Sequence, residues 1–166
     1  MDDDNVLSVL AYAVNFLGVE NGDIQKKFDV ILMNWCIYSV IIAGHSNCGG
    51  AAACLKAALV PNFVPKIPVI TIYGEPADSP LNKWLQPLTL LAHSLKLPDD
   101  SDKSVEAVVL ENVKAQVENL ANTETIRKAW THGTPKKQKV FIHGWVYDLG
   151  TGLLKDLGIS RGPPEC

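Results

Sequence analysis

The stretch Val40-Ile-Ile-Ala-Gly-His-Ser-Asn-Cys-Gly-Gly50 combines the strongest structural signal and the strongest chemical signal of this 166-residue sequence. Its first part, Val40–Ala43, is an apolar and largely β-branched run of strand length, and a glycine-rich loop follows it. The next segment, Ala51–Leu59, is rich in alanine and leucine and predicts a helix. A strand, a glycine loop and a helix in this order begin an α/β unit, so the stretch predicts an α/β fold.

The loop of this stretch places His45 and Cys48 three residues apart. The free N–H groups and the dipole at the start of the following helix favour a negative charge, and therefore a thiolate at Cys48. Since an imidazole and a thiolate are common zinc ligands, we predict that His45 and Cys48 bind a metal ion. We expect Gly44, Gly49 and Gly50 to let the backbone turn tightly around it. The spacing also leaves open a purely structural role for both side chains.

A phosphate-binding loop is a second interpretation of the same stretch. Four residues separate Gly44 from Gly49, as in a P-loop. However, Gly50 and Ala51 stand where that motif requires lysine and serine or threonine, which argues against a nucleotide site. A metal-free α/β protein that uses Gly44–Gly50 to bind an anion stays open.

The flanking sequence predicts further helices and strands from the spacing of its apolar residues. We expect helices over Val6–Leu17, Pro80–Leu95 and Ser104–Trp130, strands over Val30–Met33, Val69–Tyr73 and Val140–Tyr147, and a strand or a short helix over Leu153–Ile159.

Composition excludes several classes of protein. Hydrophobic residues make up 47% and charged residues 20%, which suits a globular chain with a core and argues against disorder. With 15 basic and 18 acidic residues and no dense basic patch, nucleic-acid binding is not expected. The longest apolar run, from Val30 to Gly44, is shorter than the roughly 20 residues of a membrane-spanning helix, so we expect no membrane partner. The acidic start is unlike a secretory signal and favours a cytoplasmic protein.

Cysteine usage favours a reducing compartment. The spacing of Cys36, Cys48, Cys54 and Cys166 does not suggest a disulfide framework. Cys36 and Cys54 have apolar or alanine-rich neighbours, so we expect both to be core residues.

Five blocks of the sequence, in order, carry a resemblance to a known family. They are Ser8–Val19 (SVLAYAVNFLGV), Gly44–Gly50 (GHSNCGG), Pro80–Leu85 (PLNKWL), Glu111–Leu120 (ENVKAQVENL), and His143–Asp148 (HGWVYD) with Thr151, Gly152 and Leu154. Together they resemble the β-class carbonic anhydrases, and most closely the plant-type members found in fungi.

The resemblance implies a mostly parallel β-sheet flanked by helices and a homodimer or homotetramer. It also implies one catalytic zinc ion per chain, held by two cysteines and one histidine, and the reversible hydration of carbon dioxide to bicarbonate and a proton. His45 and Cys48 occupy the positions of the histidine and of the second cysteine.

The sequence departs from this family in one motif. The other cysteine ligand of the family lies in a C-x-D-x-R motif on the first central strand, and its aspartate and arginine form the catalytic dyad. No such motif occurs here, since Ile37-Tyr38 follows Cys36 and Leu55-Lys56 follows Cys54. We therefore assign no catalytic residue and expect the first central strand to be absent. The complete family enzyme and a non-catalytic zinc-binding or oligomerisation remnant are both compatible with this pattern.

The spacing between two blocks is a second departure. In the family, few residues connect the helix that ends in Leu-Gly-Val to the strand before the zinc loop, whereas Glu20–Ser39 intervenes here. We expect residues 1–166 to form one incomplete domain, with an insertion at 20–39 and roughly the first third of the family domain missing. An imperfect gene model and a genuine surface insertion both explain the additional residues. A start that is not the natural one also leaves a mitochondrial location open.

Overall fold

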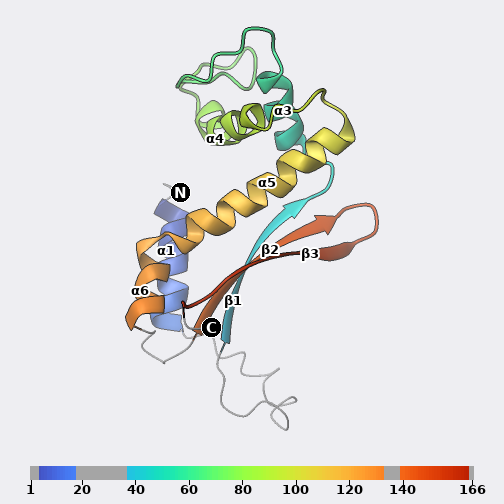
Figure 1. The fold of residues 1–166 in the computed structure, drawn as a ribbon. Helices are drawn as coiled ribbons and strands as arrows, with labels where there is room; N and C mark the ends of the chain where they lie inside the picture. Colours follow the sequence, from blue (N-terminus) through green and yellow to red (C-terminus); the bar gives the residue numbers. More distant parts are fainter. Residues whose placement is uncertain (1–3, 18–36, 133–138, 165–166) are drawn as a thin grey trace. The chain divides into compact units, whose positions relative to one another are not determined.

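A computed structural model describes residues 4–17, 37–132 and 139–164 of the chain (Figure 1). Its elements are α1 (Asp4–Tyr12), the π-helical turn η1 (Ala13–Leu17), β1 (Ile37–His45), α3 (Gly49–Ala58), α4 (Pro80–Ser94), α5 (Asp102–Ala121), α6 (Glu124–His132), β2 (Lys139–Asp148) and β3 (Leu153–Arg161). The strand predicted at Val30–Met33 lies outside the described residues, as does most of the expected insertion at 20–39. Residues 37–39 of that insertion belong to β1.

The three strands form one sheet in the order β1-β2-β3. β1 and β2 run in the same direction, and β3 returns beside β2 through a hairpin (Figure 1). The hairpin turn is closed by the N–H of Gly152, which donates to the main-chain oxygen of Asp148 at 2.8 Å. Gly152 has a φ of +73°, a conformation that favours glycine. The α/β class is confirmed, with one parallel and one antiparallel strand pair among the described residues, and Leu153–Ile159 is a strand.

The strand predicted at Val69–Tyr73 is wrong. A buried side chain, rather than a neighbouring strand, bonds this segment, because Oδ1 of Asn82 accepts the N–H groups of Thr71 and Ile72, each at 2.9 Å. The β-branched residues of the segment therefore belong to an extended loop that is bonded to α4.

The single helix predicted over Ser104–Trp130 is also wrong, because two helices, α5 and α6, occupy this segment. Thr123 separates them. Its hydroxyl and its N–H both donate to the oxygen of Leu120, at 2.8 and 3.0 Å, and its own oxygen accepts the N–H of Arg127 at 3.0 Å. A threonine that bonds its local backbone in this way ends one helix and begins the next.

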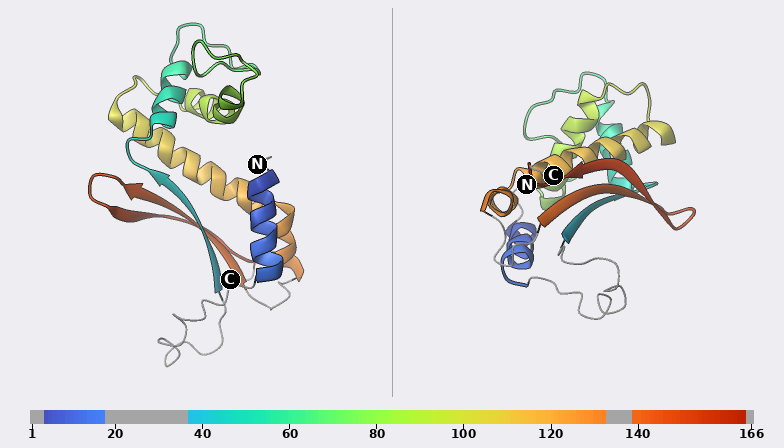
Figure 2. Two further views of the ribbon diagram at one scale, coloured as in Figure 1. Left: turned by 180° about the vertical axis from the view of Figure 1, so that it is seen from behind. Right: turned by 60° about the horizontal axis from the view of Figure 1, so that its bottom comes forward.

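The described residues fall into two compact units. The first comprises the described parts of residues 1–42, 116–144 and 158–166. In it, α1 lies beside α6 (Figure 2). Its core contains Leu10, Val14, Val117, Leu120, Ala121, Ile126, Val140 and Ile142. Val140 and Ile142 are buried while their neighbours along β2 are only half-buried, so the helices of this unit cover one face of the strand.

The second unit comprises residues 43–115 and 145–157. Its core contains Ala51, Leu55, Ala58, Ala92, Val105, Val108 and Val109, from α3, α4 and the first part of α5. Cys54 is fully buried, which confirms its prediction as a core residue. Cys36 lies outside the described residues. The expectation of one domain over residues 1–166 stays a prediction.

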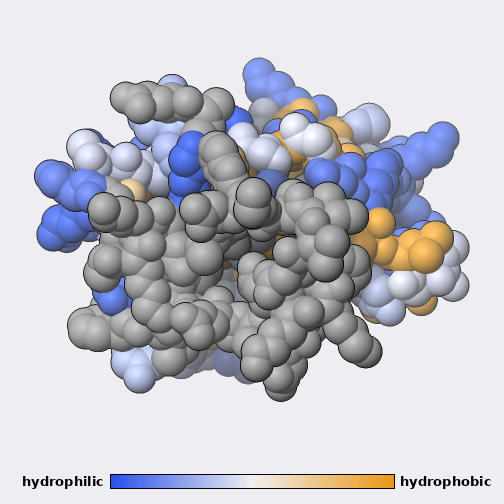
Figure 3. Space-filling view, turned by 90° about the horizontal axis from the view of Figure 1, so that it is seen from below, coloured by the Kyte–Doolittle hydropathy of each residue, from blue (hydrophilic) through white to orange (hydrophobic). Residues whose placement is uncertain are grey.

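Some large apolar side chains of the described residues reach the surface, among them Tyr73, Trp84 and Leu153. On the face drawn in Figure 3, hydrophobic residues outside the grey atoms form separate areas between hydrophilic ones. Within the described part of the chain, no helix has the length and apolar character needed to cross a membrane.

Candidate functional site

The two predicted metal ligands lie at the junction of β1 and α3. His45 is the last residue of β1 and is exposed, and Cys48 directly precedes α3. Cys48 has extended backbone angles (φ −67°, ψ 110°), and its main-chain oxygen accepts the first hydrogen bond of the helix, from Ala52 at 3.0 Å. Its side chain makes no capping hydrogen bond. The thiol therefore lies at a helix N-terminus, as the sequence predicts, with its sulfur available to a ligand.

The His45 ring makes a local hydrogen bond that distinguishes its two nitrogens. Nδ1 lies 3.0 Å from the main-chain oxygen of Ser46. Because a carbonyl oxygen only accepts, this contact requires a proton on Nδ1, and in the neutral ring Nε2 then holds the lone pair. Metal-binding histidines commonly have this arrangement, in which the second ring nitrogen donates to a backbone carbonyl.

Ser46 connects the loop to the turn between β2 and β3. Its N–H donates to the oxygen of Tyr147 at 2.9 Å, and its Oγ accepts the N–H of Leu149 at 2.9 Å. The same hydroxyl donates to Oδ1 of Asp148 at 3.4 Å. Oδ1 also accepts the N–H of Gly150 at 2.8 Å. This N–H group and, next, the Thr151 side chain lower the pKa of the Asp148 carboxyl below its ordinary value, because they stabilise the charged form.

The glycines around the two ligands play a different part from the one expected. None of Gly44, Gly49 and Gly50 has a positive φ; the residue of this loop that does is Asn47, at 54°. Gly44 instead permits close packing, since a Cβ there would lie 2.8 Å from Cγ2 of Val113 and 2.9 Å from Cγ1 of Val109. Asparagine adopts the left-handed conformation more readily than other non-glycine residues, a signal that the sequence offered at Asn47.

The donor set was compared with the needs of a catalytic zinc ion, which takes three protein ligands and leaves one position open. His45 and Cys48 fit two of these positions in donor type. Residues 4–17, 37–132 and 139–164 contain no group of three or more His, Cys, Asp or Glu side chains placed to hold a metal ion. Cys54 does not add a third, because its Sγ is buried and donates to the oxygen of Leu85 at 3.6 Å, and burial raises the pKa of its thiol. The described residues thus supply two side chains of the required donor types and not the third.

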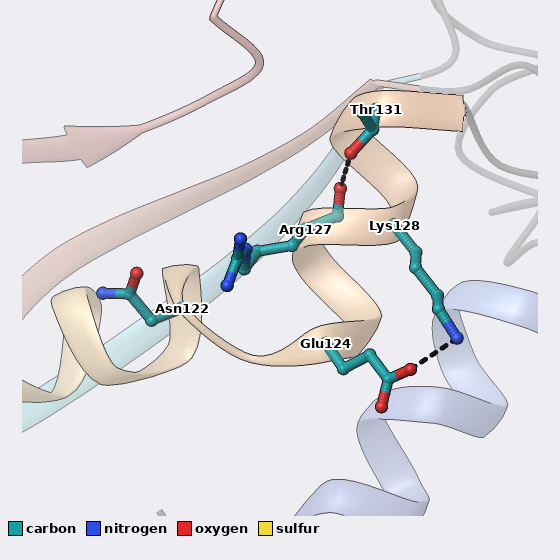
Figure 4. Close-up of a pocket in the computed structure, with 5 residues that line it drawn as sticks. All are labelled: Asn122, Glu124, Arg127, Lys128 and Thr131. Carbon is teal, nitrogen blue, oxygen red and sulfur yellow. Dashed lines mark hydrogen bonds and ion pairs between the residues drawn. The ribbon is translucent and has the colours of Figure 1, made fainter.

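A separate surface hollow of about 420 Å³ lies in the first unit. It is lined by Asn122, Glu124, Arg127, Lys128 and Thr131 (Figure 4). Glu124 and Lys128 point toward each other and form an ion pair at 2.5 Å, and the Thr131 hydroxyl bonds the oxygen of Arg127 within α6. The hollow includes neither predicted ligand, and its charged side chains are largely exposed. Pairs of this kind stabilise a helix only slightly.

Comparison with known proteins shows the family of the chain. The family model described as carbonic anhydrase matches residues 32–154, which include both predicted ligands and most of the chain. The chain belongs to the carbonic anhydrase family. The resemblance to the β class is confirmed by solved structures of β-carbonic anhydrases. The β-carbonic anhydrase from Coccomyxa, in complex with acetazolamide, matches with a TM-score of 0.66 and 26% identity. The match covers 99% of this chain and 58% of the Coccomyxa chain. The tetrameric enzymes from Sordaria macrospora match with a TM-score of 0.61 and 27% identity, over 96% of this chain and 63% of theirs.

Curated carbonic anhydrases are similar over a comparable range. Carbonic anhydrase 1 of Escherichia coli O157:H7 is 26% identical over 137 residues, which is 82% of this chain and 54% of that protein. The carbonic anhydrase of Emericella nidulans is 28% identical over 159 residues, which is 93% of this chain and 52% of that protein. The chain therefore spans about half the length of the curated carbonic anhydrases that it matches.

Proposed function

We propose that this carbonic anhydrase chain serves the zinc-dependent, reversible hydration of carbon dioxide to bicarbonate and a proton, with His45 and Cys48 as two of the zinc ligands. One observation carries the proposal. Within the segment that matches the family model, the end of β1 presents a histidine whose Nδ1 bonds a carbonyl oxygen, and a cysteine directly precedes α3, three residues further along the chain. These are the donor types that a catalytic zinc ion takes.

A zinc ion bound there would lower the pKa of a coordinated water to about 7 and so supply a hydroxide at neutral pH. Neighbouring residues of this chain position the two proposed ligands. Cys48 directly precedes α3, at the helix end where backbone N–H groups lack helical partners. The bond from His45 Nδ1 to Ser46 keeps the other nitrogen as a lone-pair donor. The proposal requires a third protein ligand, which the described residues do not supply.

The alternative is a non-catalytic zinc-binding or oligomerisation remnant of the family. The absence of a C-x-D-x-R motif from the sequence favours it, because the first cysteine ligand and the Asp–Arg dyad of the family are then missing. In either case we propose a homo-oligomer, a dimer or a tetramer, in line with the tetrameric relatives from Sordaria macrospora. A cytoplasmic location also stays a proposal.

Two measurements on the purified chain test these functions. Zinc content per chain is measured by elemental analysis, and carbon dioxide hydration by stopped flow. The variants are His45→Ala and Cys48→Ser, and His132→Ala, which changes an exposed histidine at the end of α6, is the matched control.

We expect both site variants to lose zinc while His132→Ala retains it. Hydration that depends on His45 and Cys48 supports the enzyme. Bound zinc without hydration supports the remnant. A wild-type chain that binds no zinc excludes the enzyme and the zinc-binding remnant, and leaves the oligomerisation remnant and the anion-binding loop.

A further inference from the structure

We propose that Ser46 and Asp148 are positioning residues that hold the His45 imidazole in the form that presents its Nε2 lone pair to a metal ion. This inference rests on the proposed function, because the Nε2 lone pair of His45 has a role only if His45 binds a metal ion. It concerns residues that neither donate to the metal nor touch the substrate. They act on His45 through the main-chain carbonyl of Ser46.

The first step of the argument is that every polar group of Ser46 is bonded. Its oxygen accepts from His45 Nδ1 at 3.0 Å. Its N–H and its hydroxyl bond Tyr147 and Leu149, both at 2.9 Å. Two anchors that are distant in sequence, one near the end of β2 and one in the turn after it, fix the orientation of this residue. The direction of its carbonyl, which accepts the imidazole proton, is fixed with it.

The second step is that Asp148 is itself held. Its Oδ1 accepts the N–H of Gly150, and its main-chain oxygen accepts the N–H of Gly152, both at 2.8 Å. The carboxylate is thus held within the hairpin turn by bonds that do not involve Ser46. The contact between the Ser46 hydroxyl and Oδ1 joins residues 102 positions apart, so it ties the loop to a separate element.

The third step concerns the length of the loop. Only Ser46 and Asn47 stand between the end of β1 and Cys48, and Asn47 already has a positive φ. A change in the orientation of Ser46 therefore alters the presentation of His45 directly. Groups that orient metal ligands in this way typically change metal affinity by about 10- to 100-fold when they are removed.

The test measures the tautomer of His45 in the metal-free full chain by nitrogen-15 NMR of the imidazole. The variants are Ser46→Ala and Asp148→Ala. Ser46→Thr keeps the hydroxyl, and Asp148→Asn keeps an oxygen that accepts from Gly150 and Ser46. Ser94→Ala and Asp100→Ala, which change exposed residues away from the loop, are the matched controls. Thermal unfolding shows which variants are folded. If Ser46→Ala does not fold, the test relies on Asp148→Ala alone.

We expect His45 to carry its proton on Nδ1 in the wild type. The ratio of Nδ1–H to Nε2–H should fall about 2- to 12-fold in both alanine variants, the range for one net hydrogen bond. The two conservative variants and the two controls should keep the wild-type ratio. An Nε2–H tautomer in the wild type, or a ratio unchanged by both alanine variants, would overturn the inference.

Cobalt(II) titration, followed by the thiolate-to-cobalt absorption band, gives a second measurement. If the wild type binds cobalt, its affinity should fall about 10- to 100-fold in the alanine variants. An equal affinity in the wild type and both variants overturns the inference. If the wild type binds none, the proposed function fails, and the tautomer ratio still decides whether Ser46 and Asp148 position His45.

Discussion

Gly44 lies so close to Val113 that a Cβ on the glycine would come within 2.8 Å of the valine Cγ2. This contact sets the approach of β1 to α5 one residue before the predicted ligand His45. It explains why a glycine without an unusual φ occupies the end of a β-branched strand.

The first prediction follows from this contact. Gly44→Ala should destabilise the chain by about 1–3 kcal/mol, because an additional methyl group in a packed contact forces β1 away from α5. Urea denaturation measures the free energy of unfolding. Gly49→Ala is the matched control, since nothing lies within 4 Å of its Cβ position. The double variant Gly44→Ala/Val113→Ala should recover part of the loss, and no recovery would contradict the steric explanation.

Asn82 is the basis of a second prediction. Its side chain is fully buried and makes four hydrogen bonds: it accepts the N–H groups of Thr71 and Ile72 and donates to the oxygens of Glu75 and Pro76. Asn82→Ala should cost about 3–5 kcal/mol, because it leaves several backbone groups without partners. Thermal unfolding and limited proteolysis within residues 69–79 measure the effect.

Two further variants check that the amide itself is responsible. Asn82→Asp should be similarly harmful, since a carboxylate oxygen would then face the two carbonyl oxygens. The exposed Asn119, changed to alanine, should leave stability within about 0.5 kcal/mol of the wild type. A tolerated Asn82→Ala would show that the loop is held by other contacts.

The two described cysteines should differ in reactivity. Cys54 is fully buried, and burial raises the pKa of its thiol, so little thiolate is accessible. Cys48 is partly exposed at the start of α3. Iodoacetamide should therefore modify Cys48 well before Cys54 in the folded chain, and peptide mass mapping reads the two sites separately. Both should react at similar rates in urea; early modification of Cys54 without denaturant would contradict its burial.

Acid should weaken the turn between β2 and β3. The Gly150 N–H and the Thr151 side chain lower the pKa of Asp148 in the folded chain. A carboxyl with a lower pKa when folded adds stability above its unfolded pKa, about 3.9, and loses this contribution as the pH falls through its folded pKa. Asp148→Asn should thus be less stable than the wild type at pH 7, and the difference should vanish in strong acid. Urea midpoints of the wild type and the variant at pH 7 and pH 2 measure this difference. An equal difference at both pH values would show that the charge of Asp148 is not its cause.

Much of the fold was predictable because it follows from local spacing. The runs that became β1, α3, α4 and β2 were identified from apolar periodicity, which reflects the geometry of one strand or one helix. The two failures have different causes. Thr123 ends α5 through its own backbone contacts, and the β-branched residues from Val69 to Tyr73 are bonded by Asn82 instead of a strand. No local pattern predicts that the side chain of an asparagine about ten positions away will accept the N–H groups that a neighbouring strand would otherwise accept.

For the candidate site, the sequence established the chemistry of the donors and their order: an imidazole and a thiol three residues apart, at the end of a strand and the start of a helix. Those properties depend on covalent spacing and on backbone geometry within one short segment. Which nitrogen of His45 is free, and what holds it, was decided by Ser46 and its contact with Asp148, 102 residues further along the chain. Such contacts form only when the packing of separate elements brings their polar groups within hydrogen-bond distance, and local spacing does not encode that distance.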